Sequence, residues 1–516
     1  MITKKLSNMK HLIALSVILI STVGFSQKLR FKVEGVKDTT VFLTKYYGTK
    51  LFYADTAEMK AGYVEFNAAK HDLKPGVVAL LLPGQKYFEV IYNNEEVSVE
   101  TKGPDFVGNM KIKKSEENKI FVDYINFIQS NRKLANSLAE ERKKYKEEDK
   151  NYVVLSDRID SISKKVVAYQ ENLIHTNPTK LVGKIIKMSM DVHVPEAPKD
   201  ANGKVIDENY RYFYFRNHFW DNIDLKDDRL VNTPVFGNKV EYYFGKNMLV
   251  QHPDTILAMA IPFINRLNPK SEMFKYVVDY VTNAFGKSNI MGMDKVYVHM
   301  VNQYYCKTDE QGNSLAYWMK DKEKMEELCK ENKIRMNLVQ GAVPPNIRLV
   351  DTTDVNWRDF YSLKSDYTIL YFWDPECGHC KKTTPKLQTL YEKKFKDRNV
   401  EIFAVGKATG EDFEKWKKFI RENKLSFINV GLTKSLYEQA TADPRRFIPK
   451  YTTLESLNYH DTYDIYATPR IFVLDKDKKI IAKQLTISQL EDFIDRVQNV
   501  KNVEKIFPPD PEEEAH

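Results

Sequence analysis

The chain has 516 residues, of which 42% are hydrophobic and 12% aromatic, and its formal net charge at pH 7 is +8. This length predicts more than one domain, with enough apolar side chains for a core in each. The small basic excess, without a basic stripe interleaved with aromatic side chains, argues against nucleic-acid binding. No G-x-S-x-G, Walker, G-x-G-x-x-G or H-E-x-x-H motif supports a hydrolase, a nucleotide-binding enzyme or a zinc peptidase.

Residues 1–26 have the pattern of a signal peptide. Three lysines precede an apolar run from Leu12 to Val23, and small residues stand just before Gln27. A run of about a dozen residues is too short to cross a bilayer. No cysteine follows that could carry a lipid, and a retained membrane anchor is the alternative. We therefore expect export to the periplasm or cell envelope, without an integral membrane span.

Residues 27–105 show the two-residue period of half-buried strands. Leu29, Phe31 and Val33 alternate with basic residues. Further strand-like runs lie at 63–66, 77–82, 87–92 and 97–99. Asn93-Asn94 is expected to form a hairpin turn between the last two runs. The segment is predicted to be a small antiparallel β domain.

From residue 110 to residue 340 the pattern changes to helices. Apolar side chains recur at helical spacing from Ile120 to Ile128 and from Phe274 to Val281, and proline-containing stretches separate the helices. Alternating charges between Arg132 and Lys150 indicate the exposed face of a long helix or of a helical hairpin. This segment is predicted to be a large all-α domain.

An aromatic cluster lies within the helical segment. It spans Tyr210 to Phe215 and continues with His218, Phe219 and Trp220. So many aromatic side chains are more typical of a core between helices, and a groove for an unfolded polypeptide is the alternative.

Two cysteines of the helical segment, Cys306 and Cys329, have three interpretations. We slightly favour two unbonded, buried side chains. A structural disulfide and a relay of electrons to Cys377 are the alternatives in an exported protein. His299 lies on the same helical face as Cys306, but the sequence does not place the further ligands that a metal site needs, so no metal is predicted.

The segment 342–502 contains the motif Cys377-Gly378-His379-Cys380. A buried-strand run, Thr368 to Phe372, precedes the motif and helical spacing follows it. Cys377 is therefore predicted at a helix N-terminus, where unpaired N–H groups and the helix dipole favour a thiolate. Cys380, about one turn later, can form a disulfide with Cys377 or resolve a mixed disulfide. Half of a zinc site is the alternative, but no second pair of ligands accompanies the motif, and we expect no cofactor beyond the redox-active disulfide.

At these residues the chain resembles the thioredoxin-like family. Within it, the chain is most similar to the exported TlpA/ResA-like thiol-disulfide oxidoreductases with N-terminal β and helical accessory domains. Trp373 stands at the position of the family's tryptophan, and Pro385 at that of its helix-kinking proline. Thr468-Pro469 resembles the family's cis-proline, which implies a substrate-binding role for both residues; an ordinary trans proline is the alternative.

The resemblance is incomplete where classical thioredoxins carry a buried acid, because this chain has Tyr371 there. The proton acceptor for Cys380 is therefore open between Glu376 and water. His379 is expected to tune the thiolate, together with Glu376 and Trp373, rather than to act as a base. Gly-His between the two cysteines resembles the pattern of disulfide isomerases.

The predicted fold class is thus multidomain. An α/β thioredoxin-like domain follows the small antiparallel β domain and the large all-α domain, and residues 503–516 form a disordered acidic tail. The expected function is exchange of dithiol and disulfide with thiol- or disulfide-containing envelope proteins, as a reductase recycled by another thioredoxin-like protein. A disulfide isomerase and a non-catalytic envelope protein that binds polypeptides are the alternatives.

Overall fold

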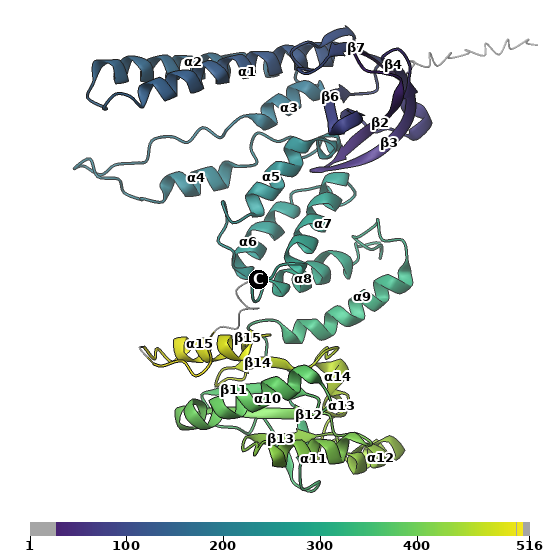
Figure 1. Cartoon of the computed structure of the whole chain (residues 1–516), viewed down its shortest axis with the longest axis vertical. Coiled ribbons are helices and arrows are strands. Elements are labelled where there is room, and N and C mark those ends of the chain that lie inside the picture. Colours follow the sequence, from purple (N-terminus) through teal and green to yellow (C-terminus); the bar gives the residue numbers. More distant parts are fainter. Residues whose placement is uncertain (1–26, 502, 509–516) are drawn as a thin grey trace, which may run out of the picture. The chain divides into compact units, whose positions relative to one another are not determined.

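The computed structural model describes residues 27–501 and 503–508 (Figure 1). The predicted signal peptide, residues 1–26, lies outside the described residues. The chain divides into two compact units, which we describe separately. The first holds the described residues up to Arg211, Trp220–Asp224 and Arg229–Gly237; the second holds Tyr212–Phe219, Leu225–Asp228 and the residues from Asn238 onward. The expected boundaries of the three domains stay predictions.

The first unit begins with a β-sandwich. Its strands are β1 (Lys28–Glu34), β2 (Thr39–Tyr47), β3 (Lys50–Met59), β4 (Tyr63–Asn67), β5 (Gly76–Leu82), β6 (Lys86–Tyr92), β7 (Val97–Lys102) and β8 (Lys111–Lys114). Two four-stranded sheets have the orders β4-β1-β7-β8 and β3-β2-β5-β6. Both contribute to one apolar core, in which the ring centroids of Phe31 and Phe88 lie 5.8 Å apart.

Three features of the sandwich differ from the sequence prediction. β1 pairs in antiparallel fashion with β4 but in parallel with β7, so the domain is not wholly antiparallel. β6 and β7 belong to different sheets, and Asn93-Asn94 therefore carries the chain across the sandwich instead of closing a hairpin. This crossing lets both strands bury alternate side chains in the same core, from opposite sides. β8 extends the sheet beyond residue 105.

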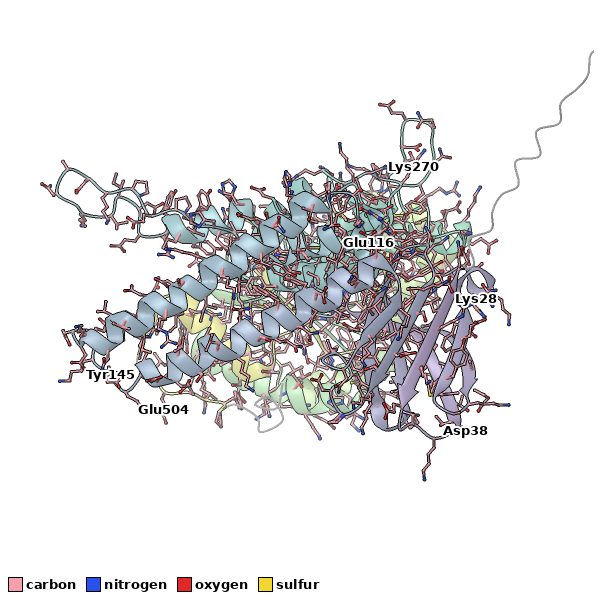
Figure 2. All side chains as sticks on the ribbon, turned by 90° about the horizontal axis from the view of Figure 1, so that it is seen from above. Lys28, Asp38, Glu116, Tyr145, Lys270 and Glu504 are labelled. Atoms are coloured by element: carbon pink, nitrogen blue, oxygen red, sulfur yellow. A yellow bond between two sulfur atoms is a disulfide. The ribbon has the colours of Figure 1, made fainter. Side chains whose placement is uncertain are left out.

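A helical hairpin follows the sandwich. α1 (Glu116–Arg142) and α2 (Lys150–Thr176) run antiparallel, and α3 (Leu181–Ser189) follows them (Figures 1 and 2). The hydroxyl oxygen of Ser115 caps α1 by accepting the backbone N–H of Asn118 at 3.0 Å. The charged stretch from Arg132 to Lys150 spans the end of α1 and the turn, as expected for a hairpin.

The helices that follow are α4 (Tyr210–His218), α5 (Pro234–Phe244), α6 (Pro253–Ile264), α7 (Glu272–Gly286), α8 (Asp294–Met300) and α9 (Lys322–Arg335). Phe219 and Trp220 are buried, as expected for a core. The same expectation was wrong for α4, which has no buried residue. Tyr212 and Phe213 are 38% and 40% exposed, and the Arg216 guanidinium lies 4.9 Å from the centroid of the Phe213 ring.

Cys306 and Cys329 are joined by a disulfide, so the favoured interpretation of two unbonded side chains was wrong. Cys329 lies in α9, and Cys306 follows the helical turns that continue α8. Their Cα atoms are 5.6 Å apart, within the range that a disulfide requires. A sequence separation of 23 residues does not reveal this proximity.

The C-terminal part of the second unit is a seven-stranded sheet with helices on both faces. The strands are β9 (Arg348–Asp351), β10 (Trp357–Asp359), β11 (Tyr367–Trp373), β12 (Val400–Gly406), β13 (Ile428–Gly431), β14 (Arg470–Leu474) and β15 (Ile480–Lys483), in the order β10-β9-β13-β12-β11-β14-β15. The helices are α10 (Gly378–Leu390), α11 (Asp412–Glu422), α12 (Lys434–Ala442), α13 (Leu454–Leu457), α14 (Tyr459–Thr462) and α15 (Ile487–Val497). β11 is parallel to β12 and antiparallel to β14.

β11 is an inner strand between β12 and β14, and it contributes side chains to two cores. Ile369, Tyr371 and Trp373 pack on one face with side chains of α10 and α15. Leu370 and Phe372 pack on the other face, where the Phe372 ring lies 4.9 Å from that of Tyr463. Because both faces are buried, the strand is continuously apolar, and it ends where the cysteine motif begins.

The C-terminal segment also differs from its prediction. The buried ammonium of Lys394 bonds with the fully buried carboxylate of Glu491 and donates to the carbonyl of Glu504 at 2.9 Å. The backbone N–H groups of Ile506 and Phe507 donate to Glu491 at 3.0 and 3.1 Å. Residues 503–508 are thus held on the domain and are not a disordered tail, whereas 509–516 lie outside the described residues.

Candidate active site

Cys377 occupies the N-cap of α10, as predicted from the strand-to-helix pattern. β11 ends at Trp373, and the Cys377 N–H closes the following turn by donating to the carbonyl of Asp374 at 3.2 Å. The Asp374 carboxylate accepts the N–H of Glu376 at 2.7 Å and so holds the same turn. The turn directs the first N–H groups of α10, which have no partner within the helix, toward the Cys377 sulfur.

The Cys377 thiol is half-buried and free. Burial alone would raise its pKa, but hydrogen bonds with the backbone N–H groups of Cys380 and His379 and with the side chains of Thr468 and Cys380 together outweigh burial and lower the pKa below its ordinary value. The sulfur also contacts the Thr468 carbonyl oxygen, to which the thiol donates at 3.2 Å. Cys377 is therefore the accessible and more acidic thiol of the pair.

The Cys380 thiol has the opposite character. It is free and has no exposed surface. Burial raises its pKa to about 12, although the backbone N–H of Asp374 donates to the sulfur at 3.5 Å. At neutral pH the pair therefore combines one reactive thiol with one protonated, shielded thiol.

The loop before β14 completes the site. The Thr468–Pro469 peptide bond is cis, which agrees with the interpretation that we favoured from the sequence. The Thr468 carbonyl faces the Cys377 thiol, and Tyr466, two residues earlier, is 80% exposed. The structure therefore brings together residues that are 91 positions apart in the sequence.

The three residues that we expected to tune the site lie in different surroundings. Trp373 is buried, with its ring 5.1 Å from that of Phe419. His379 is exposed on the first turn of α10. Glu376 is exposed and pairs with Lys415 at 3.3 Å and with a second lysine, and these ammonium groups lower its pKa. Their effects on the redox couple stay predictions, and Pro385 lies inside α10 as expected.

Tyr371 fills the position where a buried acid was expected by resemblance. It has no exposed surface, and its hydroxyl shares a 2.8 Å hydrogen bond with that of Thr384, which is also buried. Burial raises the pKa of Tyr371 well above its ordinary value, so the phenol stays neutral. Sequence analysis missed both Thr384 and the backbone role of Asp374, because neither position carries a pattern of its own.

Other candidate residues lie away from any ligand cluster. His299 is half-buried, and burial lowers its pKa. Within residues 27–501 and 503–508, no group of three or more His, Cys, Asp or Glu side chains could hold a metal ion. In the same part of the chain, no helix has both the length and the apolar character needed to cross a membrane.

Comparison with known proteins gives matches to the C-terminal domain and to the helical segment. Residues 365–480 match the thioredoxin-like family, and residues 168–332 match a domain of unknown function, DUF5106. A thiol-disulfide oxidoreductase ResA of Bacillus cereus is 28% identical over 160 residues, which are 30% of this chain and 78% of that protein. The ResA of Bacillus thuringiensis subsp. konkukian is 27% identical over 162 residues, again 30% and 78% of the two chains.

Solved structures give similar matches. A domain of a possible thiol-disulfide isomerase from Cytophaga hutchinsonii is 34% identical, with 31% of this chain and 94% of that chain covered and a TM-score of 0.25. A thiol:disulfide interchange protein from Bacteroides sp. is 29% identical, with 32% and 95% covered and a TM-score of 0.26.

Proposed function

Because the C-terminal part of this chain is a domain of the thioredoxin-like family, we propose that the protein is an exported thiol-disulfide oxidoreductase with Cys377 and Cys380 as its reactive pair. The observation that carries the proposal is the difference between the two thiols. The pKa of accessible Cys377 is lowered, and that of buried Cys380 is raised to about 12. The relatives named thiol-disulfide oxidoreductase support the same reaction.

The reaction runs in two exchange steps. The Cys377 thiolate attacks one sulfur of a substrate disulfide, which forms a mixed disulfide and releases the other substrate sulfur as a thiolate that takes a proton from solvent. Cys380 then loses its proton and attacks the Cys377 sulfur, which releases the second substrate thiol. The substrate gains two electrons and the Cys377–Cys380 pair is oxidised.

The high pKa of Cys380 separates these two steps in time. While Cys380 keeps its proton, it cannot compete with Cys377 for the substrate. Attack on the mixed disulfide needs a proton acceptor, for which water at the mouth of the site is the proposed candidate. Glu376 is engaged with lysines on the surface, which argues against it as the acceptor.

We propose the periplasm or cell envelope as the location and reduction as the direction. The signal-peptide pattern of residues 1–26 supports the location. Substrates are then thiol- or disulfide-containing envelope proteins, and another thioredoxin-like protein recycles the pair. A disulfide isomerase would use the same first step without net oxidation of the enzyme.

Trapping of mixed disulfides tests this function. The Cys380→Ser variant should accumulate envelope proteins in covalent complexes that dithiothreitol releases, because the second step is blocked. The Cys377→Ser variant should trap none, and a variant with Cys306→Ser and Cys329→Ser should exchange disulfides like the unmodified chain. If all variants instead captured envelope proteins equally, in complexes that resist dithiothreitol, the chain would be a non-catalytic polypeptide-binding protein and the proposal would be wrong.

A further inference from the structure

A pocket of about 400 Å³ lies in the second unit, beside the start of β14. Its lining includes Arg470 and Asp464 of the C-terminal domain and Tyr297 and Arg335 of the preceding helices. Arg470 immediately follows Pro469, so this pocket, which we call the Arg470 pocket, begins beside the loop that contacts Cys377.

The charged lining of the Arg470 pocket is mainly basic. It consists of four basic side chains and two acidic ones: Lys287, Arg335, Arg470, Lys483, Asp294 and Asp464. Both acids are already engaged, since Asp464 accepts from Arg335 at 3.2 Å and Asp294 pairs with Lys483. Lys483 also donates to the carbonyl of Leu338 at 2.8 Å. The charge that remains uncompensated is positive.

Arg470 is a half-buried cation of this group. Within residues 27–501 and 503–508 it makes no ion pair, and its Nε is buried without a hydrogen-bond partner. Its guanidinium lies 6.0 Å from the centroid of the Phe472 ring, on the same face of β14. Burial lowers the pKa of Arg470, which reflects the lost hydration that a bound anion would offset.

The pocket and the reactive thiol lie on opposite sides of the start of β14. The Thr468 carbonyl contacts Cys377, and two residues of extended chain span only about 7 Å, but Arg470 and Phe472 face the side of the sheet away from α10. A substrate strand with its disulfide at Cys377 therefore has to run past the Thr468-Pro469 loop to place a side chain beside Arg470. The planar guanidinium is suited to a carboxylate, which it can bind through two parallel hydrogen bonds.

We propose that the Arg470 pocket binds the carboxylate of an aspartate or glutamate that lies within a few residues of the target cysteine in the substrate polypeptide. The inference rests on the proposed exchange reaction and adds a selectivity to it. Substrates with an acidic residue beside the disulfide are bound and reduced in preference to neutral ones.

Matched peptides test this selectivity. Each oxidised peptide carries one disulfide and either glutamate or glutamine at one of the five positions that follow the cysteine. For at least one position, the full mature chain should reduce the glutamate peptide with a kcat/KM about tenfold higher, as expected for a charge-assisted hydrogen bond in a half-buried site. Arg470→Gln should abolish the preference through KM, and Arg470→Lys should restore part of it.

The matched control is Arg445→Gln, because Arg445 is an exposed arginine of the same domain that pairs with Asp443. It should keep the full preference. The pH dependence of Cys377 alkylation should be the same in Arg470→Gln and the unmodified chain, which shows that the variant folds and keeps its thiol. No preference at any position, or a preference that survives Arg470→Gln, would overturn the inference.

Binding without chemistry separates this inference from the proposed function. In a variant with Cys377→Ser and Cys380→Ser, fluorescence anisotropy of labelled peptides should show the same glutamate preference, again lost on Arg470→Gln. If that preference appears while the intact chain reduces no peptide, carboxylate binding by the Arg470 pocket is supported and the proposed redox function is contradicted. If succinate binds in an Arg470-dependent way but the peptides show no preference, the ligand is a free carboxylate and the inference is wrong.

Discussion

The difference between the two thiols can be measured in variants that each keep one of them. The Cys380→Ser variant leaves Cys377, and the Cys377→Ser variant leaves Cys380. The pKa of Cys377 is lowered below its ordinary value, whereas that of Cys380 is raised to about 12. We expect the two variants to react with a small disulfide reagent at very different rates and with different pH dependence.

The pKa values set the size of the difference. At pH 8, a thiol with a pKa of about 12 is thiolate in roughly one molecule in 10⁴, whereas one with a pKa below about 9 is thiolate in more than roughly one in ten. The more basic thiolate is intrinsically more nucleophilic, by roughly 15- to 30-fold for this difference. The Cys377 thiol should therefore react at least about 30-fold faster at pH 8, before the burial of Cys380 is counted.

The assay is the second-order rate of reaction with an aromatic disulfide between pH 5 and 11, with the Cys306–Cys329 disulfide intact in both variants. The rate for Cys377 should rise with pH and level off below its ordinary pKa. The rate for Cys380 should keep rising about tenfold per pH unit over the same range, because its pKa lies above it. Circular dichroism at each pH confirms that the fold persists.

Equal rates at pH 8, or a plateau for Cys380 below pH 9, would refute this reasoning. Either result would mean that burial does not hold the proton on Cys380. A plateau for Cys377 at or above its ordinary pKa would show that the N–H groups of α10 do not stabilise the thiolate.

Three further predictions concern stability. Glu491→Gln should cost about 1–3 kcal/mol, because it removes the charged acceptor of Ile506, Phe507 and Lys394 while Asp495 stays 3.6 Å from the Lys394 ammonium, and limited proteolysis should then cleave residues 503–508; unchanged melting and cleavage would contradict this. Tyr371→Phe should cost about 1–3 kcal/mol because the buried Thr384 hydroxyl loses its partner, and adding Thr384→Val should recover part of the loss in chemical denaturation. Cys306→Ser should lower the free energy of unfolding by about 3 kcal/mol, and chemical reduction of the Cys306–Cys329 disulfide should lower it by the same amount. An effect below about 0.5 kcal/mol would mean that this disulfide does not constrain the unfolded chain.

The parts of the site that sequence analysis located depend on local pattern. The apolar run of β11 and the helical spacing after it placed Cys377 at a helix N-cap, and both the family match and the fold of the domain confirm the thioredoxin-like prediction. The contact between Cys377 and Thr468 was expected only by resemblance, because 91 residues separate the two.

The parts that sequence analysis missed depend on long-range contacts. β2 and β3 were overlooked for different reasons: a register shift between Leu43 and Thr44 breaks the alternation of β2, and β3 is largely exposed. The tail was expected to be disordered because its composition is acidic, yet Lys394 and Glu491, 97 residues apart, meet to hold it. The sequence does not mark Arg470 as a binding residue, because an arginine after a proline is common. Only the fold shows that its side chain is half-buried and makes no ion pair among the described residues.

The positions of the four cysteines along the chain have a consequence for biosynthesis. Four cysteines can join into two disulfides in three ways, and only one of them pairs Cys306 with Cys329. In a chain that emerges from its N-terminus, both of these residues appear before Cys377. If the chain is exported as proposed, the structural bond can close before the reactive pair reaches the oxidising compartment, and this order of entry would limit attack on that bond by Cys377.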